Sequence, residues 1–392
     1  MMRLMKYTSN LITALIISVI VNSSLASILS NSTIDQVNNL FDMPESYSFV
    51  SPAFKKLSTP EKKKVITILA IDGGGMYGLF PLKALKQLEQ SSGQPISDLF
   101  DVMVGTSTGS IVVSALATPD NHGKPKYTVD DLISFYVNNG KVIFHRSIWH
   151  SFRTLWGLIG PIYPSDGLVQ IFDKTFSNVK LSQLKSHVII PSGVILKNSP
   201  LWFNGIDAKQ NSDLDFYVKD IVASATSAPT VFSPYKLTNI TNTMTDYGCD
   251  AGLFVNNPSL QAYVDAKLIY PDQKYIIVSL GTGMSPENTV LDQPTVFEKM
   301  GLIRGVLPFM SQSMDFHSKQ TDYQMRLLAE ENANKIMAYY RINLVLTEGK
   351  KSIFSGDPEN LKHITQLANK MVEDKQDKIS SMIGVINQVK SK

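Results

Sequence analysis

The chain has 392 residues, with 37 Lys and Arg against 34 Asp and Glu, six His and one Cys. A net charge of +3 and 43% hydrophobic residues are typical of a globular protein, and they argue against a disordered chain or one that binds nucleic acid through a basic surface. One cysteine excludes an internal disulfide and a zinc site built on cysteines. The length allows one large domain or two of ordinary size.

The first 26 residues have the features of a signal peptide. A basic start precedes an apolar run over residues 11–21, and Ser24-Leu25-Ala26 offers a cleavage site. The run is too short to span a bilayer comfortably, so we expect a secreted or exported protein whose final compartment is open. An uncleaved anchor or an amphiphilic helix of a cytoplasmic protein is the alternative. Residues 27–60 are polar and are predicted to form an N-terminal arm.

Apolar, β-branched runs along the next part of the chain predict buried strands. They lie at residues 65–71, 100–104, 188–196 and 275–280, with helical patterns between them. Strands that alternate with helices favour an α/β sheet with functional turns at the strand ends. Beyond about residue 290 the pattern is helical to the end of the chain.

A glycine turn follows the first predicted strand, with the sequence Asp72-Gly73-Gly74-Gly75-Met76-Tyr77-Gly78. Successive glycines expose backbone N–H groups, and the N-terminus of the next helix adds positive potential. Such a turn binds an anion, either a phosphate or the oxyanion of an acyl-transfer intermediate. Gly73, Gly75 and Gly78 also satisfy G-x-G-x-x-G, so a dinucleotide site and a plain tight turn remain alternatives.

The second turn, Gly105-Thr106-Ser107-Thr108-Gly109, has the pattern G-x-S-x-G between a strand and a helix. In this arrangement a serine sits on a sharp turn, and the glycines on either side relieve crowding. The following helix points its N-terminus at the negative charge that forms. Ser107 is therefore a candidate nucleophile supported by Gly105 and Gly109, and an ordinary strand-to-helix connection is the alternative.

The third turn, Cys249-Asp250-Ala251-Gly252, supplies a candidate base. An aspartate is ionised at neutral pH and accepts a proton, and the small Ala251 and Gly252 let it reach a neighbouring hydroxyl. An Asx turn or a helix cap is the alternative for Asp250. Cys249 is expected to be a small buried packing residue.

Together these turns resemble those of the patatin-like phospholipases, which are lipid acyl hydrolases, and the plant patatin type in particular. Residues 225–232 and 279–283 match as well. The resemblance implies a three-layer α/β/α fold with a mostly parallel central sheet, with a catalytic domain over residues 61–290. A helical C-terminal region over residues 291–392 follows it. Ala251 departs from the family pattern, which usually has glycine there, and its methyl group disfavours a positive φ.

The resemblance also implies the chemistry, a Ser107–Asp250 dyad that needs no histidine, metal or cofactor. Ser107 attacks the ester, Asp250 takes its proton and later activates water, and the N–H groups of Gly73, Gly74 and Gly75 hold the oxyanion. In the same turn, Asp72 and Gly78 have an ordering role. The implied partner is a phospholipid or other acyl lipid at a membrane or micelle surface, without nucleic acid, and the oligomeric state is open.

Other readings compete with this one. His317 and His363 follow Asp250 in the order of a Ser–Asp–His triad, although both lie in polar segments and are expected to be solvated. A nucleotide-binding oxidoreductase would use the first turn and an acid such as Asp98. A non-catalytic storage or interaction protein could keep the same fold.

Two apolar segments are candidates for contact with lipid. Residues 142–163 mix aromatic side chains with arginines, and residues 300–310 are also rich in apolar side chains. Both compositions suit a lipid interface or the rim of an acyl-chain pocket, and helices packed on the sheet are the alternative.

Overall fold

The computed structural model describes residues 65–145, 147–154, 159–285, 302–346 and 352–390, with the backbone alone for residues 148 and 302–308. The predicted signal peptide (residues 1–26) and N-terminal arm (residues 27–60) lie outside these ranges. Within them, no helix is both long enough and apolar enough to cross a membrane.

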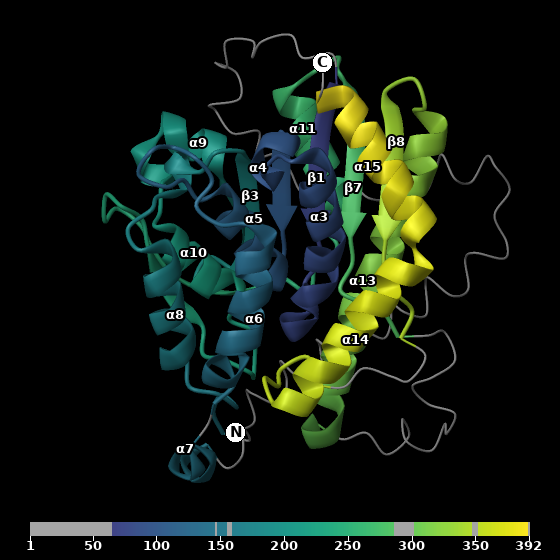
Figure 1. Cartoon of the computed structure of the whole chain (residues 1–392). Helices are drawn as coiled ribbons and strands as arrows, with labels where there is room; N and C mark the ends of the chain where they lie inside the picture. The colour runs from purple at the N-terminus through teal and green to yellow at the C-terminus, as the bar shows by residue number, and fades with distance from the viewer. Residues whose placement is uncertain (1–64, 146, 155–158, 286–301, 347–351, 391–392) are drawn as a thin grey trace, which may run out of the picture. The chain divides into compact units, whose positions relative to one another are not determined.

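A sheet of eight strands runs through the described residues, in the order β5-β6-β3-β2-β1-β7-β8, with β4 paired to β3 outside this order (Figure 1). The strands are β1 (Val65–Ile71), β2 (Val102–Gly105), β3 (His187–Val194), β4 (Ser199–Asn204), β5 (Tyr235–Thr238), β6 (Thr245–Asp250), β7 (Lys274–Leu280) and β8 (Ile336–Ile342). The pairs that join β3, β2, β1, β7 and β8 are parallel, whereas β4, β5 and β6 are added through antiparallel pairs. The sheet is therefore mixed but mostly parallel at its centre, as predicted.

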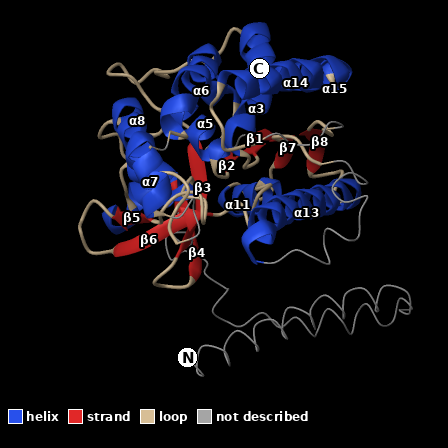
Figure 2. Ribbon diagram, turned by 90° about the horizontal axis from the view of Figure 1, so that it is seen from below, coloured by secondary structure: helices blue, strands red, loops and turns tan. Residues whose placement is uncertain are grey.

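Helices cover both faces of this sheet. They are α3 (Leu79–Ser92), α4 (Ile96–Leu99), α5 (Thr108–Ala117), α6 (Val129–Ile143), α7 (Ile148–Arg153), α8 (Asp166–Phe176), α9 (Gly205–Gln210), α10 (Val218–Ala225), α11 (Ser259–Ile269), α13 (Leu302–Glu331), α14 (Pro358–Asp374) and α15 (Gln376–Lys390). Figure 2 shows α3, α5, α6, α14 and α15 on one side of the sheet and α11 and α13 on the other. The predicted three-layer α/β/α fold is confirmed.

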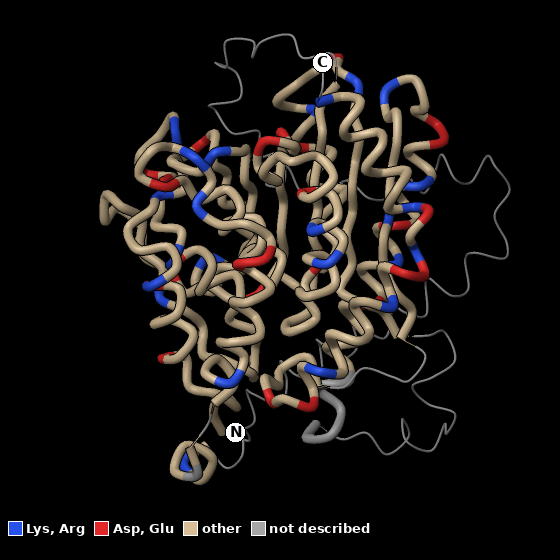
Figure 3. Tube along the Cα trace, in the orientation of Figure 1, with Lys and Arg blue, Asp and Glu red and all other residues tan. Residues whose placement is uncertain are grey.

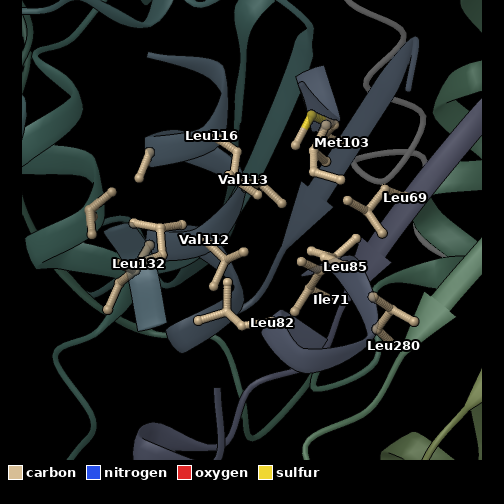
Figure 4. Close-up of a cluster of buried hydrophobic side chains, with 14 of the residues drawn as sticks. Leu69, Ile71, Leu82, Leu85, Met103, Val112, Val113, Leu116, Leu132 and Leu280 are labelled. Carbon is tan, nitrogen blue, oxygen red and sulfur yellow. The ribbon is translucent and has the colours of Figure 1, made fainter. Parts of the chain in front are cut away.

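The central strand β1 shows why the sequence builds these layers. Its side chains alternate in direction, so that Leu69 and Ile71 enter one hydrophobic core while Ile66, Ile68 and Ala70 enter the other. β1 and β2 carry no charged side chain, and charges of both signs lie on the outer helices and loops (Figure 3). Figure 4 shows the first core, where β1 packs against α3 and α5.

The C-terminal region differs from its prediction in one respect. It contains α13, α14 and α15, but it also contains β8, which pairs in parallel with β7 at the edge of the sheet. Apolar residues of α14 and α15 such as Ile364 and Ile379 belong to the same core as β1. Residues after 290 therefore pack as part of the α/β domain, and the predicted boundary at residue 290 does not separate two packed units.

Candidate active site

Ser107 lies on the sharp turn between β2 and α5, with its backbone at φ 50° and ψ −117°. A positive φ is unfavourable for a residue with a side chain, and such strain is concentrated at functional sites. The flanking glycines permit close backbone contacts: a Cβ on Gly105 would lie 2.2 Å from the carbonyl oxygen of Gly109. A Cβ on Gly109 would lie 2.4 Å from the carbonyl oxygen of Ile71. A side chain at either position would collide with the backbone, which explains why this turn has glycine at Gly105 and Gly109.

Asp250 ends β6 and meets Ser107 across the sheet. The Ser107 hydroxyl donates a hydrogen bond of 2.5 Å to Oδ2 of Asp250, and Oδ1 accepts one of 2.8 Å from the N–H of Gly252. Burial raises the pKa of Asp250 to about 6, although both hydrogen bonds oppose this rise. The backbone N–H of Asp250 donates to the carbonyl oxygen of Ser227, within the matched stretch at residues 225–232. The two predicted site residues are thus in direct contact.

Ala251, the departure from the family pattern, does not disturb this pair. It is fully buried and keeps a negative φ, so its methyl group meets no conformational penalty. The neighbouring Cys249 is half-buried, and burial raises the pKa of its thiol. It is therefore less buried than predicted.

The glycine turn after β1 faces the same site, with one correction to the predicted set of donors. Gly74 and Gly75 line a cavity together with Ser107. The N–H of Gly73 instead donates to the backbone carbonyl of Asn256, at 3.1 Å, so this amide is already engaged. The hydroxyl of Thr282 donates to the carbonyl oxygen of Gly73, at 2.5 Å, which ties the matched stretch at residues 279–283 to the turn.

Asp72 orders the turn through a partner that sequence reasoning missed. The guanidinium of Arg341, on β8, donates to both oxygens of Asp72 at 2.7 and 2.6 Å, and it also bonds the hydroxyl of Ser279 at 2.9 Å. Ser318 of α13 donates to Asp72 as well, at 3.1 Å. Both charged side chains are at most 3% exposed. An arginine inside the β-branched and aromatic run at residues 336–346 was the available signal.

The cavity beside Ser107 has a volume of about 280 Å³. It is lined mostly by apolar or small groups from several parts of the chain, including Ala228, Pro229, Leu253, Met310, Met314, Ile353 and Phe354. A second, narrower pocket shares Gly75, Ser107 and Phe354 with it, and its other lining residues include Ile111, Phe135, Phe144, Leu168 and Phe232. Ser107 therefore lies between two largely apolar spaces.

The histidines do not form a triad with the dyad. Nδ1 of His317 accepts a hydrogen bond of 3.4 Å from the N–H of Asn257, and burial lowers the pKa of this histidine. His363 lies on α14. Both are half-buried, so the prediction of solvated side chains was wrong, but among the described hydrogen bonds neither contacts Ser107 or Asp250.

Asp98 is not placed to bind the ribose of a dinucleotide at the glycine turn, as the oxidoreductase alternative requires. Asp98 lies on α4, before β2 begins, and forms an ion pair with Lys185 at 3.2 Å. β1 and β2 are parallel, so Asp98, which precedes β2, lies at the end of the sheet opposite to the glycine turn that follows β1. Among the described residues, no three His, Cys, Asp or Glu side chains gather in an arrangement that could hold a metal ion.

Comparisons with known proteins agree with the arrangement of the three turns. A family model described as patatin-like phospholipase matches residues 69–263. Patatin-like protein 4 of Arabidopsis thaliana is 30% identical over 250 residues, which cover 59% of this chain and 62% of that protein, so the chain spans less than two thirds of this relative. Patatin-like protein 1 of the same plant is 27% identical over 368 residues, covering 86% of this chain and 88% of that protein. Patatin-2-Kuras 3 of Solanum tuberosum is 26% identical over 336 residues, covering 79% and 84%. The chain belongs to the patatin-like phospholipase family.

Proposed function

We propose that the protein is an exported lipid acyl hydrolase of the phospholipase A type, cleaving acyl esters of glycerophospholipids or related lipids. The observation that carries this proposal is the hydrogen bond between the Ser107 hydroxyl and the buried carboxylate of Asp250, beside a largely apolar cavity. A nucleophile, a base and an apolar space at one point are what the hydrolysis of an acyl ester requires. The substrate is taken from a membrane or micelle surface.

The reaction proceeds in two steps. The Ser107 oxygen attacks the ester carbonyl as its proton moves to Oδ2 of Asp250, and the negative charge forms on the carbonyl oxygen. The N–H groups of Gly74 and Gly75, at the cavity wall, are the proposed donors to this oxyanion, with the N-terminus of α5 adding positive potential. Asp250 returns its proton to the leaving alcohol. It then takes a proton from a water that attacks the acyl-enzyme carbonyl, and it returns this proton to the Ser107 oxygen as the bond to the fatty acid breaks.

Asp250 works as a base without histidine because of its surroundings. A general base is most effective when its pKa lies near the working pH. A free aspartate is too weak a base for this, but burial raises the pKa of Asp250 to about 6. The carboxylate therefore remains ionised at neutral pH while binding a proton more readily than an exposed aspartate.

Labelling with a fluorophosphonate probe tests this proposal. The wild-type protein should be labelled and should hydrolyse a soluble p-nitrophenyl ester, whereas Ser107→Ala and Asp250→Asn should lose both activities. Ser311→Ala is a matched control, since Ser311 is another serine that lines the cavity and has no base beside it among the described contacts. Wild-type labelling that survives in Ser107→Ala would refute the mechanism.

Labelling, together with calorimetry of NAD(P) binding, separates the alternatives. A non-catalytic storage or interaction protein would be folded yet neither labelled nor active on any acyl ester. A nucleotide-binding oxidoreductase would bind NAD(P) in a calorimeter, and this binding would weaken when a side chain is added at Gly75, where φ is +55°.

A further inference from the structure

The short helix α7 exposes large aromatic side chains although two neighbouring hydroxyl side chains are buried. Ser151 on the helix and Thr154, which directly follows it, are only 8% and 7% exposed. Its largest aromatic side chain faces outward, with Trp149 84% exposed. Phe152 on the helix and Ile159 shortly after it are also exposed. A soluble helix normally buries its apolar stripe, so this arrangement needs an apolar environment outside the protein.

Hydrogen bonds within α7 and to Pro161 order this helix. Ser147 caps the helix by accepting a hydrogen bond of 3.1 Å from the N–H of His150, and the Ser151 hydroxyl donates to the carbonyl oxygen of Ser147. The Thr154 hydroxyl donates to the carbonyl oxygen of His150, whose ring also bonds the carbonyl of Pro161. These hydrogen bonds order the helix itself, and the bond from His150 to Pro161 ties it to the stretch that follows.

The α7 segment joins the wall of the catalytic cavity. After α7 the chain returns beside residues 230–231, where the N–H groups of Ile162 and Tyr163 donate to Thr230 and Val231 at 3.0 and 2.9 Å. The residues just before these acceptors, Ala228 and Pro229, line the cavity at Ser107. Figure 1 shows α7 at the end of the molecule toward which the parallel strands point, the end where the catalytic turns follow β1 and β2.

The ionisable side chains of this segment that carry charge are all basic. Residues 142–163 contain two arginines and two histidines but no aspartate or glutamate. Arg153 is the last residue of α7 and has an exposed side chain, one position after the exposed Phe152. Tryptophan with arginine is the composition of elements that rest in the boundary between lipid headgroups and acyl chains.

From these observations we infer that the α7 face, defined as Trp149, Phe152, Arg153 and Ile159, docks on a phospholipid surface. This inference rests on the proposed lipid hydrolase function and names the part of the surface that delivers substrate to it. The apolar side chains enter the interface, and Arg153 contacts lipid phosphates. The cavity at Ser107 then opens near the surface from which an acyl ester is drawn. Basic side chains without acidic neighbours on the segment favour lipid over a neutral protein partner.

Binding to vesicles tests this inference without any turnover. The protein carries Ser107→Ala, and it is sedimented with phosphatidylcholine vesicles and with phosphatidylcholine vesicles that contain phosphatidylserine. Because full burial of a large apolar side chain contributes about 1.5–3 kcal/mol, Trp149→Ser and Ile159→Ser should each weaken binding at least about tenfold. Arg153→Gln should reduce mainly the preference for phosphatidylserine. Fluorescence of Trp149 should shift to shorter wavelength with vesicles, measured as the Ser107→Ala parent minus the same parent with Trp149→Phe.

Leu268→Ser is the matched control. Leu268 is 47% exposed and lies near the C-terminal end of α11. This end of α11 is close to the start of β7, and therefore at the end of the sheet opposite to the catalytic turns. This variant should bind vesicles as the parent does. Thermal unfolding shows that each variant is folded.

The outcomes separate this inference from the proposed function. Vesicle binding that survives in both Trp149→Ser and Ile159→Ser overturns the inference, whatever the enzyme hydrolyses. A dimer in solution that dissociates on Trp149→Ser, without binding to vesicles, assigns the face to a second copy and also overturns it. Selective loss of vesicle binding supports it even if the hydrolysis of lipids fails, because binding is measured on the inactive protein.

Discussion

Replacing Arg341 by Met would show how strongly the last strand of the sheet supports the glycine turn after β1. Arg341 donates two hydrogen bonds to Asp72 and one to Ser279, and both charged side chains are at most 3% exposed. Removal of one partner leaves a buried, uncompensated carboxylate, which destabilises a protein by about 3–5 kcal/mol. Native proteins have a total stability of only about 5–15 kcal/mol, so the variant should be greatly weakened but can remain folded.

Urea unfolding and ester kinetics measure the two consequences. We expect kcat to fall more than KM rises, because the turn that holds Gly74 and Gly75 loses its anchor while the apolar cavity remains. The double variant Asp72→Asn with Arg341→Met should recover much of the lost stability, since no charge is then buried alone. Arg341→Lys should be intermediate, because an ammonium cannot form the two parallel hydrogen bonds. A single Met variant within about 1 kcal/mol of wild type, or a double variant weaker than the single, would refute this reasoning.

Four further results are expected. Since Asp250 must be ionised and burial raises its pKa to about 6, kcat/KM for a soluble ester should fall below a pH of about 6; an acid limb at the ordinary value of 3.8 would contradict this. Because the pKa of Asp250 is higher in the folded protein, protonation of its carboxyl group favours folding at low pH. This contribution to stability is lost as the pH rises from 3.8 to about 6. Asp250→Asn should therefore stabilise the inactive protein at pH 7 by at most about 3 kcal/mol, an advantage that calorimetry should find absent at pH 3. His317→Ala and His363→Ala should keep most of the ester hydrolysis in folded protein, and a loss as large as that of Ser107→Ala would restore the triad. Gly109→Ala should destabilise the protein by several kcal/mol in urea, because its Cβ would lie 2.4 Å from a backbone oxygen, and unchanged stability would show that the turn can relax.

The parts of the site that sequence could predict are those written in contiguous residues. Ser107 with its glycines and Asp250 with Gly252 each occupy one turn. The turns after the parallel strands β1 and β2 lie at the same end of the sheet, as the alternation of strands and helices predicts. Asp250 instead ends β6, which runs antiparallel to β3, so its approach to Ser107 depends on a strand arrangement that the sequence did not indicate. The Ser107 hydroxyl and Oδ2 of Asp250 lie 2.5 Å apart, as expected if the two turns work together. The strands β1 and β7 were recognisable because both of their faces are buried, which leaves a continuous apolar run.

What the sequence could not predict depends on contacts between distant residues. Arg341 is 269 positions from Asp72, and nothing local marks either as the other's partner. β8 was assigned to a helical region because its edge position exposes Met337 and half-exposes its tyrosines, which removes the apolar run that marks a central strand. Gly73 was counted among the oxyanion donors because its acceptor, the carbonyl of Asn256, comes from a loop far along the chain.

The late position of Arg341 also has a consequence for how the protein is made. A chain grows from its N-terminus at about 5–20 residues per second, so Ser107 and Asp250 leave the ribosome before the strand that neutralises Asp72. Parallel pairing of β8 on β7 closes a long loop, and such non-local contacts form late. Until then the glycine turn holds a buried charge without its counter-ion. We therefore expect incomplete chains, whether nascent or truncated before residue 341, to show little of the proposed hydrolase activity, which would arise only once the whole domain has been synthesised.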